Sequence, residues 1–344
     1  MKLIRILVFP IALIYDVVTR IRNLFFDLGV FSSTSFQIPI IAVGNLSVGG
    51  TGKTPQIEYL IRLLSKKYQL AVLSRGYGRS TKGYLKINQN NTSKEVGDEP
   101  LQFYRKFKQI TVAVDEQRVR GVQTLLAQEN PPNLILLDDA FQHRKITAGF
   151  YLLLTKYDEL FVDDFLLPTG GLRESARGAK RAHAVVVSKC PANLSKASQD
   201  QVIQKIRKYF KGPVFFSGIS YAEEVQNSKQ ESIGIEALKD FEVILVTGIA
   251  KPAPLVQFLK EQEIRFQHLK FKDHHEFTTQ DLQLIKETFL EVTSAKKIIL
   301  TTEKDFVRLS DELDALYYIE ITTKLIDKEQ DFDKLFLSYL SKSL

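Results

Sequence analysis

Residues 47–54 of the chain, SVGGTGKT, could bind the phosphates of a nucleotide. They match the phosphate-binding loop pattern G-x-x-x-x-G-K-[ST], except that Ser47 stands at the first glycine position. Glycines let successive backbone N–H groups turn toward one anion, while Lys53 would reach the β- and γ-phosphates and Thr54 would be a ligand of Mg²⁺. The alternative is a chance glycine-rich turn. The predicted nucleotide contacts in this loop are Ser47, Val48, Gly49, Gly50, Thr51, Gly52, Lys53 and Thr54.

Two adjacent carboxylates, Asp138 and Asp139, end the apolar run of residues 134–137. A second protein ligand of nucleotide-bound Mg²⁺ is usually an aspartate in such a position. Adjacent side chains on a strand point to opposite sides. One carboxylate would therefore hold the metal or its water, and the other would pair with a basic neighbour such as Arg144. The alternative is that the pair caps the next helix.

Several arginines follow apolar runs in glycine-rich or polar turns. They are Arg75 and Arg79 in LSRGYGRS, Arg118 in VAVDEQRVRG, and Arg173 beside Glu174 in LPTGGLRES. Such turns belong at the carboxyl edge of a parallel sheet, where ligands of open α/β folds bind. Each arginine alone could be a surface residue. Together they predict a mouth that attracts anions.

Asp98 in EVGDEPLQFY is the candidate general base. A kinase that phosphorylates an alcohol needs a carboxylate near the acceptor hydroxyl to take its proton. The alternative is that Asp98 is only the N-cap of the helix that Pro100 opens. The segment KFKDHHEF also brings Asp273, His274 and His275 together. An Asp-His pair can orient or polarise a catalytic group, although an exposed histidine is the common alternative.

Composition restricts the class of protein. The chain has 344 residues, 44% of them hydrophobic and 25% charged, which is typical of a globular protein with up to two domains. Cys190 is the single cysteine, so no intrachain disulfide can form, and the histidines have no zinc-site spacing with it. The net charge of +7 suits an anionic partner. Nucleic acid is the weakest candidate, because neither a compact basic tract nor an aromatic RNA-binding motif is present.

The first thirty residues predict a helical segment that lies in a membrane interface. MKLIRILVFPIALIYDVV resembles a secretory signal, but no small-x-small cleavage site follows it. Its uninterrupted apolar part, residues 6–15, is too short to span a bilayer and contains Pro10. One or two interfacial helices, continued by TRIRNLFFDLGVF, fit better. The alternative is an N-terminal helix buried against the domain.

The rest of the chain alternates between short apolar runs and amphipathic stretches. Runs without strict alternation, separated by helices, indicate parallel strands covered on both faces. The sequence predicts a doubly wound, mostly parallel α/β domain that contains the phosphate-binding loop and ends near residue 210. Strands in a Gly- and Pro-containing linker then lead to a second, smaller α/β domain. The predicted division is 1–30, 31–210 and 211–344.

With these motifs in order, the chain resembles the tetraacyldisaccharide 4'-kinase family, the lipid A 4'-kinases of Gram-negative bacteria. The resemblance runs nearly end to end through VGNLSVGGTGKTP, LSRGYGR, VGDEP, LDDAFQHR, LPTGGLRES, GIAKPAP, DHHEF and TTEKD. It implies transfer of the γ-phosphate of ATP, with Mg²⁺, to the 4'-hydroxyl of a tetraacyldisaccharide 1-phosphate lipid in lipid A biosynthesis. It also implies a peripheral protein on the cytoplasmic face of the inner membrane.

The resemblance implies roles residue by residue. Lys53 and Thr54 hold phosphate and Mg²⁺, and Asp98 is the base, assisted by His274. The residues implied to line the nucleotide and metal site are Asp138, Asp139, His143, Arg173 and Glu174, with Thr54, Asp138, Asp139 and Glu174 as metal ligands and His143 and Arg173 as nucleotide contacts. Arg118 is similar to a family arginine near the transferred phosphate. The chain departs from the family pattern at His275, and in LPTGGLRE where LPAGPLRE is commoner.

Two other function classes remain at this point. A membrane-associated P-loop ATPase switch of the partitioning type also combines GGTGKT with an amphipathic helix. That class has a signature lysine just before the two glycines, where this chain has Val48. A nucleotide-regulated scaffold without turnover would leave Asp98 and His274 unexplained. The expected partners are a glycolipid substrate and a membrane surface; nucleic acid and a protein partner are not inferred, and a monomer is the expectation.

Overall fold

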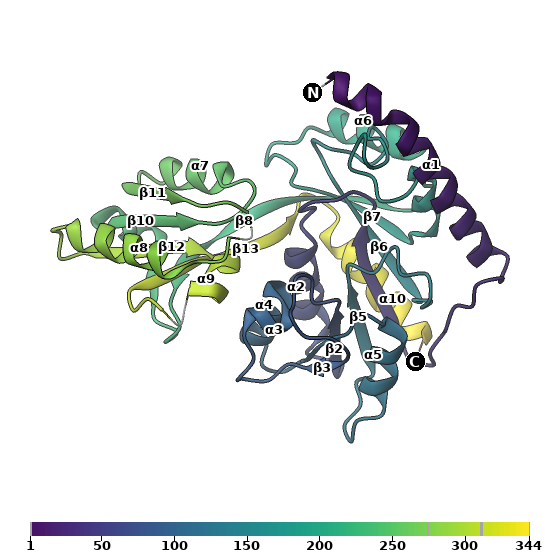
Figure 1. Ribbon diagram of the computed structural model, residues 1–344, viewed down its shortest axis with the longest axis horizontal. Helices are drawn as coiled ribbons and strands as arrows, with labels where there is room; N and C mark the ends of the chain where they lie inside the picture. Colours follow the sequence, from purple (N-terminus) through teal and green to yellow (C-terminus); the bar gives the residue numbers. More distant parts are fainter. Residues whose placement is uncertain (1, 274, 310–311, 344) are drawn as a thin grey trace.

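One sheet runs through both parts of the molecule (Figure 1). The computed structural model describes residues 2–273, 275–309 and 312–343. The elements of the first part are α1 (Lys2–Asp27), β1 (Ile40–Asn45), α2 (Lys53–Leu64), β2 (Leu70–Ser74), β3 (Leu85–Lys86), α3 (Ser93–Val96), α4 (Asp98–Lys106), β4 (Thr111–Val114), α5 (Arg118–Leu126), β5 (Leu134–Asp138), β6 (Phe150–Lys156), β7 (Ala184–Ser188) and α6 (Lys196–Ile206). Those that follow are β8 (Val214–Gln226), β9 (Ser232–Gly234), β10 (Glu242–Thr247), α7 (Ala253–Glu261), β11 (Phe266–Lys270), α8 (Thr279–Glu291), β12 (Lys297–Thr302), α9 (Glu303–Leu309), β13 (Leu316–Leu325) and α10 (Glu329–Ser343).

The first domain is built on a parallel sheet with β1 inside it. Its strand order is β8-β7-β6-β1-β5-β2-β4-β3, and among these strands only the β3–β4 pairing is antiparallel. Strand β1 pairs with β5 on one side and with β6 on the other. Because the carboxyl ends of parallel strands meet at one edge, the segments after β1, β5, β2, β6 and β7 converge there.

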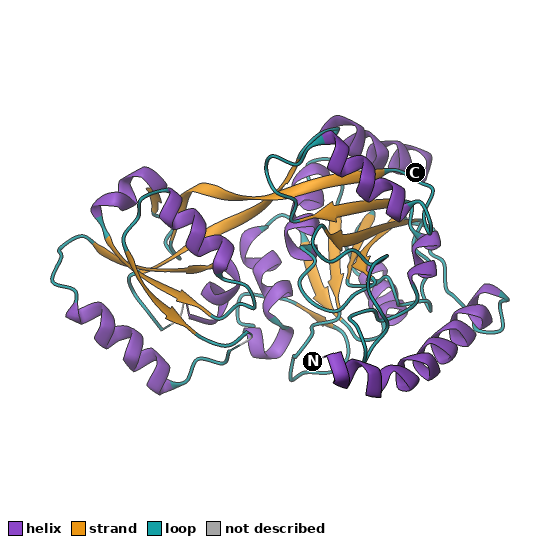
Figure 2. Cartoon of the chain, turned by 90° about the horizontal axis from the view of Figure 1, so that it is seen from above, coloured by secondary structure: helices purple, strands orange, loops and turns teal. Residues whose placement is uncertain are grey.

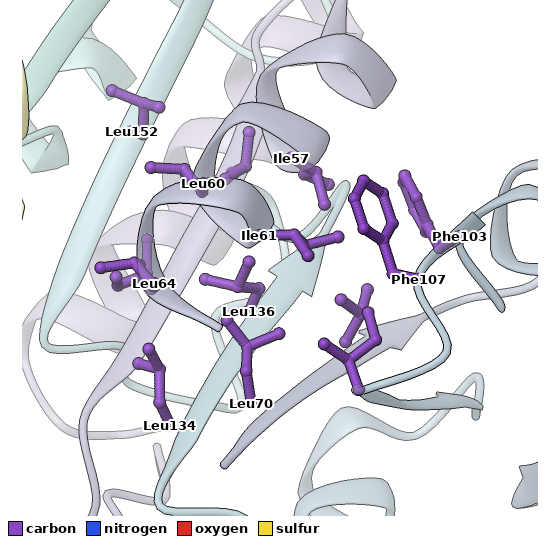
Figure 3. Close-up of a cluster of buried hydrophobic side chains, with 14 of the residues drawn as sticks. Ile57, Leu60, Ile61, Leu64, Leu70, Phe103, Phe107, Leu134, Leu136 and Leu152 are labelled. Carbon is purple, nitrogen blue, oxygen red and sulfur yellow. The ribbon is translucent and has the colours of Figure 1, made fainter. Parts of the chain in front are cut away.

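Both faces of this sheet are covered, as the strands without strict alternation predict. Ile41 and Val43 of β1 point into one core with side chains of α2 and α4, whereas Ile40 and Ala42 point into the opposite core with side chains of α5. Figure 3 shows how the spacing of Ile57, Ile61 and Leu64 directs one stripe of α2 onto the strands. The sheet is therefore doubly wound.

The second domain repeats this construction on a smaller scale. Strands β11, β10, β12 and β13 are parallel in that order. Helix α7 packs on one face through Leu255 and Leu259, and α8 and α9 pack on the other through Ile285 and Phe306.

Two long strands connect the domains. Strand β8 pairs with β7 in the first domain and then runs antiparallel to β13 in the second (Figure 2). The final helix, α10, returns to the first domain, where Phe332, Phe336 and Leu340 are fully buried against residues of its core. This packing differs from the expected division, which grouped residues 211–344. An amphipathic pattern shows that α10 has a buried face but not which sheet covers that face.

A buried group of charges, here called the Lys106 cluster, lies between the domains. Lys106 Nζ on α4 is 2.6 Å from Glu58 Oε2 on α2, 2.7 Å from Glu303 Oε1 on α9 and 3.2 Å from Glu320 Oε1 on β13. Burial, followed by the charge of Glu58, raises the pKa of Glu303 to about 8. One lysine thus pairs with carboxyl groups from both domains.

Helix α1 lies along the outside of the first domain (Figure 1). It is a single helix that contains Pro10, and side chains including Ile14, Val17 and Val18 are more than half exposed. Within the described part of the chain, no helix is both long enough and apolar enough to cross a bilayer. One side of α1 packs on the domain, where Ala12 and Phe26 are buried, and the other side is exposed, so the membrane contact stays a prediction.

Candidate functional site

The phosphate-binding loop lies between β1 and α2, as the sequence predicts. Gly49 has φ +93° and Gly52 has φ +81°, conformations that L side chains rarely adopt, so glycine is needed at both positions. The loop is held from outside, because the Val48 N–H donates to the Gly171 carbonyl oxygen at 2.7 Å. The loop therefore has the backbone turns that direct N–H groups to one anion.

Lys53 lies in a polar cluster with residues that follow two other segments. Its Nζ is 3.3 Å from Asn45 Oδ1 and 3.6 Å from Asp139 Oδ1. Arg173 donates to both oxygens of Asp139, at 2.8 and 3.1 Å, and also to Asn45. Burial alone would raise the pKa of Asp139, but Lys53 and Arg173 outweigh it and lower the pKa. Asp139 thus pairs with Arg173 and Lys53, whereas Arg144, its expected partner, binds Asp27 of α1.

Asp138 is buried at the end of β5 and faces β2. Its Oδ2 accepts a hydrogen bond from Ser74 Oγ at 2.8 Å. Burial, and after it the charge of Asp139, raises the pKa of Asp138 to about 6. A cation next to Asp138 would stabilise its ionised form against both burial and the charge of Asp139, so this carboxylate suits Mg²⁺. No group of three or more acidic, histidine or cysteine side chains within the described residues could hold a metal by itself. Bound Mg²⁺ commonly takes only one or two carboxylates together with phosphate oxygens.

Arg118 is buried at the start of α5. It donates to the Asp115 carbonyl oxygen at 2.6 Å and to the Asp138 carbonyl oxygen at 2.8 Å, while its Nε has no partner within the described residues. Burial lowers its pKa to about 10, so it stays charged at neutral pH. Burial, with help from Arg118 and Arg75, lowers the pKa of His143 to about 4. His143 is therefore neutral at pH 7.

Glu174 connects the site to α1. Its carboxylate accepts hydrogen bonds from Arg181 Nη2 at 2.7 Å, from Asn23 Nδ2 of α1 at 2.9 Å and from Gln142 Nε2 at 3.0 Å. Tyr15 of α1 also donates to the Arg173 carbonyl oxygen at 2.8 Å. With three donors already bound, Glu174 positions α1 and the Arg173 segment. Its assignment as a metal ligand, like that of Thr54 and both aspartates, stays a prediction.

Asp98 is paired with the second domain. Arg308 of α9 donates through Nε to Asp98 Oδ1 at 2.9 Å and through Nη2 to Oδ2. The N-cap of α4 is Gly97 and not Asp98, so the capping alternative does not hold. Asp98 is thus the first residue of the helix, and its carboxylate is bound by α9 of the second domain.

His274 lies outside the described residues, so its assignment as the assistant of Asp98 stays a prediction. Its neighbour His275 has other bonds. The His275 Nε2 is 2.9 Å from Asp281 Oδ2 at the start of α8, and its ring stacks on Phe271 at a centroid distance of 4.9 Å. The His275 carbonyl oxygen accepts from Arg308 at 3.1 Å. Arg308 therefore links Asp98 to the histidine segment.

Three residues that contribute to the site were not predicted from the sequence. Asn45 is a buried polar residue at the end of an apolar strand, which is a recognisable signal for a site residue. Ser74 ends β2 in the same manner. Arg308 carries no such signal, because it lies 210 positions from Asp98. Of the four arginines expected at the mouth, Arg79 instead binds Glu116 and the Gly83 carbonyl oxygen in its own loop region.

Known proteins match the chain over almost its whole length. The model of the family described as "Tetraacyldisaccharide-1-P 4'-kinase" matches residues 4–341. The chain is 49% identical to a tetraacyldisaccharide 4'-kinase of Flavobacterium johnsoniae, over 100% of this chain and 99% of that protein. It is 41% identical to one of Bacteroides thetaiotaomicron, over 97% and 93%.

A solved structure agrees with these matches. LpxK from Aquifex aeolicus, crystallised in complex with ATP, superposes with a TM-score of 0.79 at 29% identity, over 98% of this chain and 99% of that one. The α/β fold and the resemblance expected from the motifs are both confirmed. The chain belongs to the tetraacyldisaccharide-1-P 4'-kinase family.

Proposed function

We propose that the chain transfers the γ-phosphate of ATP to the 4'-hydroxyl of a tetraacyldisaccharide 1-phosphate lipid, a step of lipid A biosynthesis. The observation that carries the proposal is the convergence of Lys53, Asp138 and Asp139 at one sheet edge, in a chain whose relatives are named for this reaction. The ATP in the related LpxK structure supports ATP as the donor.

Thr54 and Asp138 would hold Mg²⁺. When bound there, the ion would supply positive charge that neutralises part of the charge of the phosphates. Lys53 would bind the β- and γ-phosphates, while Arg173 keeps Asp139 directed at Lys53. Arg118 holds the backbone at Asp138 and so positions that carboxylate.

Asp98 would take the proton of the acceptor hydroxyl. It lies where α4 meets α9 of the second domain, and Arg308 orients both of its oxygens. The acceptor hydroxyl must then reach Asp98 at this junction. His274, four residues beyond the end of β11 at Lys270, would assist Asp98.

Helix α1 would bind the cytoplasmic face of the bacterial inner membrane. Its inner side is fixed by polar bonds from Tyr15 and Asn23, so its apolar side chains remain outside. The more exposed large ones are Phe9, Ile11, Leu13, Ile14, Val17, Val18, Ile21 and Leu24. Such a helix binds through buried apolar area in the interface. The lipid substrate could then be taken directly from the membrane.

The whole proposal is tested by ATP consumption in the presence and absence of the glycolipid. We expect turnover that depends on the acceptor, with the phosphate recovered in the lipid. A switch of the partitioning type would hydrolyse ATP without the glycolipid, and a scaffold would not turn ATP over at all.

Lys53→Ala should lower the turnover of the lipid at least about 100-fold. One charge directed at the transferred phosphate typically contributes about 3 kcal/mol to transition-state stabilisation. Lys196→Met, which removes an exposed lysine on α6, is the matched control. Turnover of Lys53→Ala within a few-fold of the wild type would refute the role of the loop.

Ile14→Glu/Val18→Glu should reduce binding to anionic liposomes by about tenfold or more, since each change puts a charge where an apolar side chain enters the interface. The apparent KM for lipid should rise, and the Kd for ATP should not. Point variants are sharper than deletion of residues 1–25, because deletion also removes the Tyr15 bond to Arg173. Tyr15→Phe is the control. Unchanged liposome binding in the double variant would contradict the proposed membrane contact.

A further inference from the structure

The nucleoside half of ATP has no assigned position in the site described so far. The groups expected around the transferred phosphate, Asp138 and Asp139 after β5 and Ser74 at the end of β2, all lie on one side of β1. On its other side, β1 pairs with β6, and β7 lies beyond β6. A nucleotide is elongated, so when its γ-phosphate faces β5, its nucleoside extends toward the ends of β6 and β7.

The segment after β7 is fastened to the phosphate-binding loop. Ser188 Oγ lies 2.7 Å from the Thr51 carbonyl oxygen and 3.1 Å from that of Thr155. Lys189 follows with φ +57°, a left-handed conformation that only a small fraction of non-glycine residues adopt. A Cβ built on Gly50 would lie 3.8 Å from Lys189 Nζ. The amine of Lys189 thus lies directly beside the loop.

Two lysines meet at this corner, and only one of them is paired. Lys156, at the end of β6, has its amine 4.0 Å from a Cβ built on Gly49 and forms an ion pair with Glu159. Lys189 is partly buried, but its amine has no hydrogen-bond acceptor or carboxylate partner within the part of the chain that is described. Burial, followed by the charges of Lys156 and Lys251, lowers its pKa. The Lys189 amine is not among the fully buried atoms that lack a partner, so a ligand at this corner can reach it.

We propose that Lys189 binds the ribose of ATP, donating a hydrogen bond from Nζ to a sugar oxygen. The inference rests on the ATP binding proposed above. The partner is the ribose rather than the phosphates for two reasons. Lys53 and the N–H groups of the loop already bind the phosphates, and Lys189 lies on the β7 side of the loop. The contact does not read the base, so adenine and guanine nucleotides gain from it alike.

The test measures binding of ATP, GTP and inorganic tripolyphosphate to Lys189→Met by calorimetry. A hydrogen bond from a charged donor is strong enough that its loss should raise the Kd of ATP and of GTP about tenfold. The Kd of tripolyphosphate, which has no sugar, should stay the same, as should kcat at saturating ATP. Lys196→Met is the control for the lost charge, and Lys189→Gln replaces Lys189→Met if the latter does not fold.

Two results would overturn this role. An unchanged Kd for ATP would show that Lys189 does not bind the nucleotide, and an equal loss of tripolyphosphate binding would make it a phosphate ligand instead. Lys53→Ala separates this failure from failure of the proposed function. It should weaken ATP and tripolyphosphate together, and if it weakens neither, the phosphate-binding loop itself is misassigned.

Discussion

Asp98→Asn should lower kcat by roughly 10²–10⁴ while ATP binding is largely kept. The change removes a proton acceptor and nearly preserves the shape of the side chain. Its measurement is single-turnover transfer of phosphate to the lipid at saturating ATP. His274→Ala should also be slower, and the double variant should be less than additive if the two residues act as one unit.

The ion pair with Arg308 makes a control necessary, because Asp98→Asn also weakens a contact between the domains. Arg308→Met breaks the same pair from the other side and leaves the carboxylate in place. If Asp98 is the base, Asp98→Asn should be much slower than Arg308→Met. If both variants lose kcat equally, Asp98 acts only through the ion pair and the proposed base is wrong.

Lys106→Met should destabilise the protein by about 3–5 kcal/mol, as expected when one partner of a buried ion pair is removed. Three carboxylates from α2, α9 and β13 would then face one another without Lys106. The measurement is the free energy of unfolding in urea. Arg62, which lies 3.3 Å from Glu58 and 3.4 Å from Glu320, would compensate only in part because it is more exposed.

The pH dependence gives this prediction a second readout. The pKa of Glu303 is raised to about 8 in the folded state, so its ionisation opposes folding, with no penalty below its unfolded pKa and the full penalty above about pH 8. Without Lys106 this penalty grows, and the loss should be smaller at pH 5 than at pH 8. Glu303→Gln, which is neutral in both the folded and the unfolded state, should remove this penalty, so it should raise the free energy of unfolding at pH 7 and should partly rescue Lys106→Met. A loss below about 1 kcal/mol in Lys106→Met would refute the importance of the cluster.

The parts of the site whose contacts are local could be predicted from the sequence. The strand, loop and helix around residues 40–64 follow from an apolar run, two glycines with positive φ and an amphipathic stripe, all within one short segment. Asp138 and Asp139 were predictable because carboxylates that end a buried parallel strand must lie at the ligand-binding edge. The doubly wound sheet followed from the same kind of local pattern.

The contacts between groups that are distant in the sequence depend on the tertiary fold. The partner of Asp98 is Arg308, the partner of Asp139 is Arg173 rather than Arg144, and α10 packs on the first sheet. Periodicity shows that a side chain is buried or that a helix has an apolar face, but it does not show which surface packs against that face.

For α1 the same pattern fits a buried helix and an interfacial one. Its exposed apolar face results from polar bonds to Arg173 and Glu174, which lie about 150 residues further along the chain.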